Sequence, residues 1–436
     1  MAAPPAMGNP AQIEPVGELM HVFMHGHHIA DLRSTREGRA QLTYLPGATE
    51  VTRGLSCCLP AAGVRFSGLT VTNWLAGLLP DRSEVLRRWR ARYRVRRQDA
   101  YALLWHVGED VAGAARFVRP DRASAGNDAG SAVLVTEAEI GRRIQDLAAD
   151  ATGWTPSFGA GQFSLAGAQA KFALALTEQG WAQPSGDVAT THIFKPAIPG
   201  MPDQDLNEHL TTRLAAAVGL PVAHTEVIEF TGARALVVSR FDRYRTRAGT
   251  WRRVHQEDAV QALGLPPALK YESEGGPGAR RLVRLLRDHV SEGYAAADVA
   301  TLVDALAFNW LVVGTDAHAR NYALMHHGQA TRLAPLYDLN SFLPYADGRP
   351  NQLSMRVGFT ESDPARIGGR EWEEMARDCR LDVDDTLGRV ARMAERIVPA
   401  AEQVLTTDEV CALQSLLPRM LHDRLSGHVA ARRTRL

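Results

Sequence analysis

The chain changes character near Phe241, and this change constrains the fold more than any other feature of the sequence. Before it, short runs rich in β-branched and alternating apolar residues are separated by glycine-bearing turns, as is typical of strands. After it, apolar residues recur at helical spacing over long segments, interrupted by one short hairpin between residues 322 and 336. The pattern therefore predicts an α+β protein with two lobes, a small strand-rich lobe and a larger, mostly helical one.

A polar stretch divides the strand-rich part. Residues 119–131 carry Pro, Asp, Ser, Gly and Asn with few apolar side chains, a composition typical of a linker. A chain of 436 residues is also too long for one ordinary core and predicts two or three packed units. We expect five segments: a disordered tail at 1–17, an N-terminal subdomain at 18–120, a linker at 121–135, a small lobe at 136–241 and a helical lobe at 242–436.

Charge and cysteine content argue against several classes of protein. The 49 basic and 49 acidic residues cancel, so bulk charge predicts neither a nucleic-acid nor a membrane partner, although a local patch remains compatible with one. The four cysteines form no CxxC pair, which disfavours a disulfide framework or a cysteine-based zinc site and fits a reducing cytoplasm.

The Ala- and Pro-rich start lacks the pattern of a signal peptide. No apolar run reaches the roughly 18 residues that a membrane-spanning helix needs.

The sharpest chemical signal is the segment TDAHARN at residues 315–321, which follows an apolar helical run. The spacing of Asp316 and Asn321 is that of a phosphotransferase loop, in which the Asp accepts the proton of the attacking hydroxyl and the Asn binds Mg²⁺. Asp338 follows 17 residues later, just after the hairpin, where kinase folds place a second Mg²⁺-binding Asp; the alternative is that it caps the next turn. The three oxygen-bearing side chains predict a cage for a hard cation.

A glycine-rich loop at residues 159–171 is the second signal. Glycines allow backbone amides to approach phosphates closely, although a flexible surface loop has the same composition, and no Walker A motif is present. Lys195 ends an expected strand and is placed to reach phosphates. Glu208, on the following helix, is either its ion-pair partner or a helix-capping residue. Ser239 to Phe241 end the strand-rich part, where an exposed strand end between lobes offers backbone groups to adenine.

Two other patterns compete with these signals. His21, His25, His27 and His28 gather near a turn, but no Cys or Glu joins them at metal-ligand spacing, so a polar turn is favoured over a zinc site. A dense run of arginines at 87–97 is consistent with contact to a phosphate backbone, but we favour a solvated face or a partner contact.

Four of these stretches resemble the HipA family, the kinase toxins of bacterial type II toxin–antitoxin modules. The resemblance extends from about Met20 to beyond residue 400 and includes the N-terminal subdomain that short relatives lack. The matching stretches are residues 164–171, 256–258 with 270–278, 315–321 and 337–338.

The resemblance implies a bilobal protein-kinase-like fold that uses ATP and Mg²⁺. It implies that Asp316 is the catalytic base, that Asn321 and Asp338 bind Mg²⁺, and that Ser164 is autophosphorylated, which would add charge near the ATP phosphates and expel the loop. Ser239 stands where the best-known member has an acidic residue, so the resemblance implies that backbone contacts to adenine are kept and that a side-chain contact is lost. The implied nucleotide-binding residues are Ala166, Gly167, Ala168, Gln169, Lys171, Lys195, Ser239, Phe241, His318, Asn321 and Asp338.

The same resemblance implies partners. Family members pair with HipB, a small helix-turn-helix antitoxin that binds operator DNA, and the known target type is an aminoacyl-tRNA synthetase, glutamyl-tRNA synthetase in the best-known member. Growth arrest or persistence would follow from blocked translation. One alternative is a small-molecule phosphotransferase of aminoglycoside-kinase type, against which the N-terminal subdomain and the Ser164 motif argue. Another is a non-catalytic DNA-bound regulator that uses the arginine run, which the intact Asp316, Asn321 and Asp338 disfavour.

Overall fold

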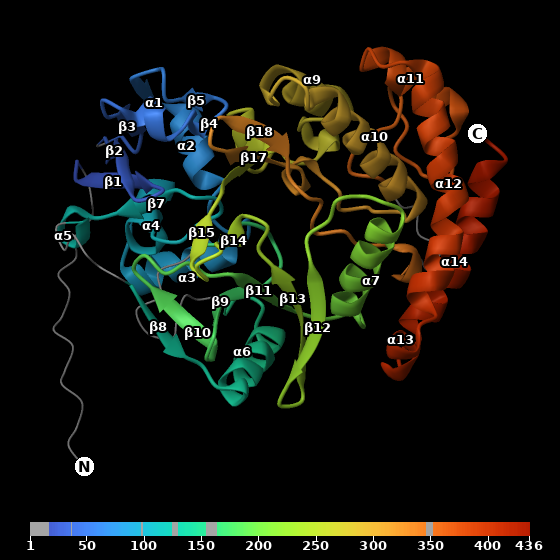
Figure 1. Cartoon of the computed structure of the whole chain (residues 1–436), viewed down its shortest axis with the longest axis horizontal. Helices are drawn as coiled ribbons and strands as arrows, with labels where there is room; N and C mark the ends of the chain where they lie inside the picture. Colours follow the sequence, from blue (N-terminus) through green and yellow to red (C-terminus); the bar gives the residue numbers. More distant parts are fainter. Residues whose placement is uncertain (1–16, 36, 97–98, 124–129, 154–163, 346–351) are drawn as a thin grey trace.

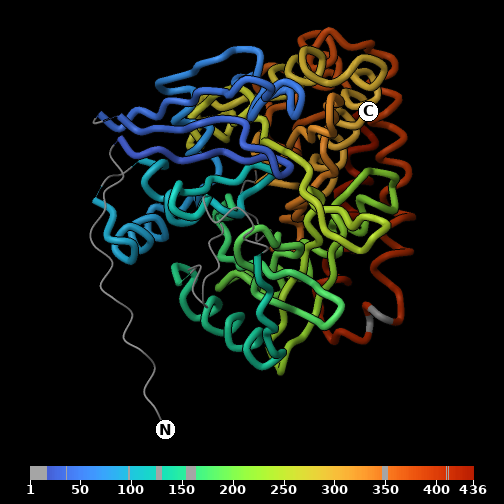
Figure 2. Tube along the Cα trace, turned by 60° about the vertical axis from the view of Figure 1, so that its left-hand side comes forward, coloured from blue at the N-terminus to red at the C-terminus, as the bar shows by residue number. Residues whose placement is uncertain are grey.

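The computed structural model describes residues 17–35, 37–96, 99–123, 130–153, 164–345 and 352–436. The first part of the glycine-rich loop and nearly all of the expected disordered tail lie outside these residues. Figure 1 shows an N-terminal sheet with its helices above a second, larger sheet, and a helical region beside both. Figure 2, from another side, shows the N-terminal region lying against both other parts of the chain.

The N-terminal region is built on an antiparallel sheet of strand order β6-β3-β2-β1-β7. Burial alternates along β1, so that Met20, Val22 and Met24 face the core, as the period of a half-buried strand requires. Trp74 and Trp89, on two of the helices, are among the largest fully buried side chains. The elements are β1 (Leu19–Met24), β2 (His27–Ser34), β3 (Ala40–Tyr44), α1 (Ala48–Val51), β4 (Gly54–Ser56), β5 (Leu59–Pro60), β6 (Arg65–Ser67), α2 (Leu69–Ala76), α3 (Ser83–Tyr93), α4 (Ala100–Val107), β7 (Arg116–Val118) and α5 (Pro120–Ala123).

The second sheet has six strands in the order β12-β13-β11-β9-β10-β8. The spacing of Thr136 and Glu139 predicts a capping box, and helix α6, which contacts three of these strands, begins with it. The register places Lys195 opposite Leu236 on the neighbouring strand. The elements are β8 (Ser131–Leu134), α6 (Glu137–Ala149), β9 (Phe172–Thr177), β10 (Gly180–Ser185), β11 (His192–Pro196), α7 (Gln204–Ala217), β12 (Thr225–Phe230) and β13 (Ala233–Ser239).

Two strands of this sheet lie where the sequence suggested none. The end of the expected linker forms β8, an edge strand whose four residues are all exposed, and β10 follows the turn after β9. Strand β10 contains Pro184, which cannot donate a hydrogen bond to a ladder. Strand β8 is stabilised by pairing with β10, and β10 also pairs with β9, which local composition does not reveal.

The helical region also contains a three-stranded sheet, β16-β17-β18. The sequence suggested one helix over residues 257–263, but Glu257 pairs with Leu324 in the sheet and the helix begins only after Asp258, whose carboxylate caps it. The elements are β14 (Arg243–Arg245), β15 (Trp251–Arg253), β16 (His255–Asp258), α8 (Ala259–Ala262), η1 (Glu272–Glu274), α9 (Ala279–His289), α10 (Ala295–Leu311), η2 (Ala319–Asn321), β17 (Ala323–His327), β18 (Ala330–Leu333), η3 (Leu343–Tyr345), α11 (Gly369–Asp378), α12 (Val383–Leu405), α13 (Asp408–Ala412) and α14 (Leu417–Arg433).

Two large apolar cores organise these elements. One is continuous from the N-terminal sheet into the six-stranded sheet and includes Met20, Trp74, Phe172 and Phe194. The other fills the helical region. The N-terminal region and the strand-rich lobe therefore pack as one body, although a polar stretch separates them in the sequence. The whole is the expected α+β arrangement of a strand-rich lobe and a helical lobe.

Candidate active site

A cleft of about 570 Å³ is lined by both the strand-rich and the helical lobe. Asp316 lines it, and so does every residue that the sequence predicted to bind nucleotide or metal, whereas Ser164 does not. The lining residues from that predicted set are Ala166, Gly167, Ala168, Gln169, Lys171, Lys195, Ser239, Phe241, His318, Asn321 and Asp338. The structure thus brings together side chains that are up to 172 positions apart in the sequence.

The loop that carries Asp316 leaves α10 through a strained turn. Val313 has a φ of 54°, a conformation that a β-branched residue rarely adopts. At Gly314 a Cβ atom would lie 2.5 Å from Oδ1 of Asn309, so no side chain fits. Further along, the Asn321 side chain donates to the Asp316 carbonyl, 2.8 Å. These contacts hold the loop in one conformation, with the Asp316 carboxylate at the cleft.

The Asp316 carboxylate is exposed and accepts one strong hydrogen bond. The Tyr271 hydroxyl donates to its Oδ1 at 2.6 Å. Burial and the nearby carboxylate raise the pKa of Tyr271, so the phenol remains protonated at neutral pH and can keep donating. His318 lies beside Tyr271 with its ring edge-on, and its buried Nδ1 has no partner within the part of the chain that the structure describes. This nitrogen is available to a polar group that enters the cleft.

Lys195 lies between two carboxylates. Its Nζ is 2.7 Å from Oε1 of Glu208 on α7 and 2.6 Å from Oδ1 of Asp338. Burial lowers the pKa of Lys195, but the two carboxylates outweigh it and hold the pKa above its usual value. Burial likewise raises the pKa of Asp338, and Lys195 and Lys171 reverse the effect, so this carboxyl group stays ionised. Of the two roles considered for Glu208, the structure shows the ion pair.

The described part of the glycine-rich loop forms one wall of the cleft. Lys171 donates from Nζ to the Ala166 carbonyl at 2.9 Å, and a Cβ atom on Gly167 would approach that Nζ to 2.6 Å. Gly167 also has a φ of 109°, which only glycine adopts readily. Burial, reinforced by the charge of Lys195, lowers the pKa of Lys171 to about 8. This lysine therefore loses its charge as the pH rises through about 8.

The end of strand β13 at Ser239 also borders the cleft. The Ser239 N–H donates to the His224 carbonyl at 2.9 Å and is therefore not free to bond a ligand in this conformation. The Phe241 ring lies against that of Tyr337, with centroids 5.3 Å apart. A planar ligand in this part of the cleft would meet an aromatic surface and the backbone between Ser239 and Phe241.

The N-terminal region contributes Asp81, which the sequence did not single out. Its carboxylate pairs with Arg320 of the loop that carries Asp316 and lies 2.9 Å from Nζ of Lys270, and its N–H donates to the Gly167 carbonyl at 3.0 Å. Burial raises the pKa of Asp81, but Arg320 and Lys270 outweigh it and lower the pKa below its usual value. One N-terminal carboxylate thus ties the glycine-rich loop to the loop that carries Asp316. No local motif marks it, since its partners are 86 to 239 positions away.

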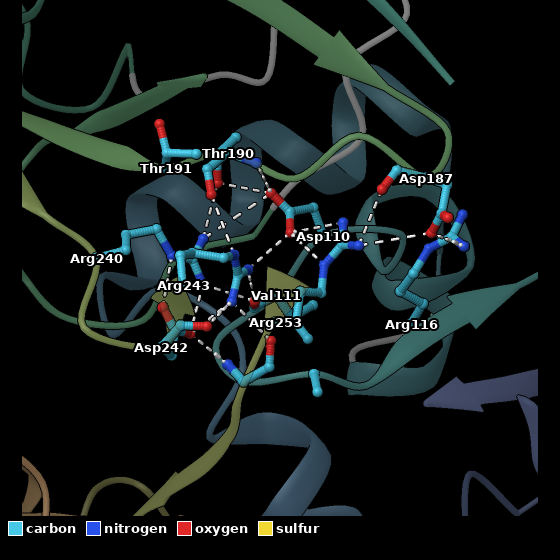
Figure 3. Close-up of polar contacts among 12 residues, drawn as sticks. Asp110, Val111, Arg116, Asp187, Thr190, Thr191, Arg240, Asp242, Arg243 and Arg253 are labelled. Carbon is cyan, nitrogen blue, oxygen red and sulfur yellow. Dashed lines mark hydrogen bonds and ion pairs between the residues drawn. The ribbon is translucent and has the colours of Figure 1, made fainter. Parts of the chain in front are cut away.

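A buried network of charges holds the segment that follows Ser239 (Figure 3). Asp110, from the loop after α4, lies 2.9 Å from Nη2 of Arg243 and accepts the hydroxyl of Thr190 at 2.6 Å. Arg240 pairs with Asp242 at 2.8 Å and donates to the Val111 carbonyl at 2.9 Å.

The network spans the junction between the N-terminal region and the cleft. Asp242 also accepts the Gly113 N–H at 2.7 Å, and Arg243 donates to the Gly113 carbonyl at 2.9 Å. Each charge is thus met by an opposite charge or a backbone dipole, which offsets the cost of burying it. The N-terminal region therefore orients the backbone that borders the cleft.

The two lobes, the loop with its Asp and Asn, and the polar cleft between the lobes define an enzyme of the protein-kinase class. Family models give the same result in more detail. The HipA N-terminal domain matches residues 20–118 and the HipA-like C-terminal domain matches residues 163–404. The chain belongs to the HipA family.

Related sequences and a related solved structure support this family assignment. The chain is 35% identical over 420 residues to the putative kinase Y4mE of Sinorhizobium fredii, an alignment that covers 94% of this chain and 97% of that protein. It is 30% identical over 376 residues to the serine/threonine-protein kinase toxin HipA of Shewanella oneidensis, covering 80% and 81%. The Shewanella HipA chain solved with HipB and operator DNA shares the fold, with a TM-score of 0.76 at 24% identity over 95% and 99% of the two chains.

Replacement of Asp110 tests the buried network. In Asp110→Ala the fully buried Arg243 guanidinium loses one of its two carboxylates, so we expect the free energy of unfolding to fall by about 3–5 kcal/mol. Asp187→Ala is the matched control, because this carboxylate sits at the exposed end of the network, bonded to Arg116 at 2.6 Å with 56% of its side chain exposed. Its loss should cost under about 1 kcal/mol. Urea denaturation measures both free energies of unfolding. Equal losses of stability in the two variants would contradict the stabilising role of the buried network.

Proposed function

We propose that this chain is an ATP- and Mg²⁺-dependent serine/threonine protein kinase that acts as the toxin of a toxin–antitoxin module. The observation that carries the proposal is the convergence of Asp316, Asn321, Asp338 and Lys195 on one cleft. The first three are the oxygen donors expected of a base and a magnesium site, and the fourth is the cation expected at the phosphates.

The donor set fits the implied cofactors. Mg²⁺ prefers carboxylate and amide oxygens, and the Asn321 amide nitrogen already donates to the Asp316 carbonyl, which leaves its oxygen for a cation. Asp338 is held ionised and oriented by Lys195. The glycine-rich loop supplies backbone amides and Lys171 for the phosphates. The Ser239 N–H is bonded to the His224 carbonyl, so adenine would use the other backbone groups of Ser239 and Phe241. Bound ATP with Mg²⁺ would provide the γ-phosphoryl group and neutralise charge on the phosphates.

The Asp316 carboxylate is proposed to act as the base. It takes the proton of the serine or threonine hydroxyl while the hydroxyl oxygen bonds to the γ-phosphorus and the bond to the bridging oxygen breaks. Its exposure lets a protein side chain reach it, and the Tyr271 hydrogen bond holds it in place. Weak basicity suffices, because little negative charge develops on the attacking oxygen in a loose transition state.

Family membership supports the proposed partners and target. The Shewanella HipA chain was solved in a complex with HipB and operator DNA. We propose that this chain binds a HipB-like helix-turn-helix antitoxin and reaches operator DNA through it. We further propose that it works in the cytoplasm and phosphorylates an aminoacyl-tRNA synthetase, of glutamyl-tRNA synthetase type, so that translation stops and growth arrests or cells persist. In the segments described, none of the helices has the length and apolar character to cross a membrane.

Ser164 is proposed as the site of autophosphorylation, and its surroundings suggest a condition for it. The side chain is fully buried, its hydroxyl donates to the Leu78 carbonyl at 2.8 Å, and its N–H donates to the Asp110 carbonyl at 2.9 Å. No kinase could reach the hydroxyl in this conformation. Phosphorylation would therefore follow release of the loop from the N-terminal region, and a phosphate with its charge could not return to the buried position.

Replacement of Asp316 tests the kinase proposal. We expect Asp316→Asn to lower transfer of labelled phosphate from ATP by about 10²–10⁴-fold, the range of a lost general base. Because the carboxylate is exposed, the unfolding midpoint and nucleotide affinity should stay close to those of the wild type. A phosphoproteome comparison of cells that express the two forms would identify the target. Equal labelling by both forms would refute the mechanism, and label in a small metabolite with none on protein would indicate the aminoglycoside-kinase type of activity instead.

Nucleotide affinity should depend on pH through Lys171. Its pKa of about 8 means that it loses its charge as the pH rises through 8, while bound phosphates would favour the charged form. The dissociation constant for a fluorescent ATP analogue should therefore rise between pH 7.5 and 9.5, by at most about tenfold per unit. Arginine keeps its charge throughout this range, so Lys171→Arg should give a nearly flat profile. A slope that survives this substitution would show that another group titrates.

The buried position of Ser164 predicts a change in nucleotide binding after modification. Incubation with ATP and Mg²⁺ should place label on Ser164, and Ser164→Ala should remove it without loss of transfer to other proteins. The modified protein should bind the fluorescent ATP analogue about tenfold more weakly or worse, since Gly167 and Lys171 belong to the same loop. Phosphoprotein with unchanged affinity would mean that the loop returns to its place despite the charge.

A further inference from the structure

The outer face of the N-terminal sheet carries a group of donor side chains that the kinase site does not use. His21 lies on β1, and His28 and Asp31 lie on β2. All three are partly exposed, with 19%, 31% and 26% of their side chains accessible. They therefore lie at the surface of a rigid, paired part of the sheet rather than in a mobile loop.

One carboxylate oxygen is shared by both imidazoles. Oδ1 of Asp31 is 2.9 Å from Nδ1 of His21 and 2.8 Å from Nε2 of His28, and the three donor atoms all lie within 4.8 Å of one another. Bonds of roughly 2.0–2.2 Å to one metal ion would place neighbouring donors about 3 Å apart at right angles and about 3.4 Å apart in a tetrahedral site. The two imidazole–carboxylate distances therefore match neighbouring positions around one ion with little movement of the side chains.

A β-bulge brings His28 to this face. In an unbroken strand, residues 28 and 31 would point to opposite faces, because side chains alternate. The register instead pairs Val22 with Ala30 and Phe23 with His28, so Ile29 is the extra residue and is buried with Ala30. Bulges commonly re-aim a side chain in this way. Asp31 needs no such device, since it lies directly opposite His21 across the two strands.

Phe23 orients both imidazole rings. Its ring is stacked on His28 with centroids 5.2 Å apart and an interplanar angle of 26°, and it meets His21 edge-on at 6.5 Å and 87°. The two histidine rings are 4.3 Å apart. Ring contacts of this kind limit rotation about the side-chain bonds, so less conformational entropy would be lost when an ion binds.

We propose that His21, His28 and Asp31 bind one divalent transition-metal ion of the Zn²⁺ or Ni²⁺ class. Two imidazoles and one carboxylate on a single face leave further positions for water or for a donor from a partner. Imidazole ligands select such ions over Mg²⁺, so the site is chemically distinct from the proposed magnesium site in the cleft. The proposal does not depend on the kinase activity.

A second group of donors, Cys57, Glu257 and His326, has a different character. The Glu257 carboxylate already accepts from the Ser56 hydroxyl, from the Cys57 N–H at 2.8 Å and from His326 at 3.1 Å. Burial, with the nearby carboxylate, raises the pKa of the Cys57 thiol, so it remains protonated at neutral pH. These contacts tie the N-terminal region to the three-stranded sheet, and a metal ion would have to break them.

Titration of the untagged, full-length, metal-stripped protein with Co²⁺ and Zn²⁺ tests the site. We expect one ion to bind per chain, visible as ligand-field absorption with Co²⁺ and as heat with Zn²⁺, without competition from millimolar Mg²⁺. His21→Ala and His28→Ala should each weaken binding about tenfold or more. His27→Ala is the matched control, because His27 neighbours His28 on β2 but lies outside the cluster, and it should leave the affinity unchanged.

Three outcomes would overturn the proposal. These are the absence of stoichiometric binding, binding that persists when both His21 and His28 are replaced, and binding that His27→Ala weakens equally. In the first case the residues form a hydrogen-bonded cluster only. In the second the ion is bound elsewhere, for example at a cysteine. The unfolding midpoint of each variant checks that a loss of binding is not a loss of fold; we expect it to be unchanged, because the three residues lie on the outer face.

Discussion

The Lys195 ammonium group lies between Glu208 at 2.7 Å and Asp338 at 2.6 Å, and this contact joins three separate parts of the chain. Lys195 belongs to the six-stranded sheet, Glu208 to α7 and Asp338 to the segment after the β17–β18 hairpin. A buried lysine requires such partners, because an unpaired charge away from water is costly. The ion pair with Lys195 thus positions Asp338 at the cleft.

The N-terminal region is part of the same active-site architecture. It shares one apolar core with the strand-rich lobe, its Asp81 joins the glycine-rich loop to the loop that carries Asp316, and its Asp110 holds the backbone beyond Ser239. The carbonyl groups of Leu78 and Asp110 also keep Ser164 out of solvent. A partner that displaced this region would therefore loosen both walls of the cleft together. The region is best regarded as a support for the catalytic machinery rather than an appended module.

Local patterns predicted many elements well, and their failures have physical causes. The capping box at Thr136 and the hairpin of β12 and β13 are local features, and both are present. Strand β8 falls in a stretch that the sequence suggested was a linker, and the end of β16 falls in a stretch that it suggested was helical, because each strand is stabilised by pairing with a distant strand. Local sequence could not decide whether Glu208 caps a helix or pairs with Lys195, because the answer depends on how close Lys195 lies in the fold.

By itself, the sequence determined the two-lobed α+β class and the family resemblance. It also singled out Asp316, Asn321, Asp338 and Lys195 as candidate site residues. These follow from residue type and spacing, which are properties of short segments. Only the tertiary structure decided that Asp81 and Asp110 support the cleft, that Ser164 is buried, and that a bulge turns His28 toward Asp31. Each of these depends on contacts between elements far apart in the chain or on the register of neighbouring strands, and packing and hydrogen bonding over the whole fold determine both.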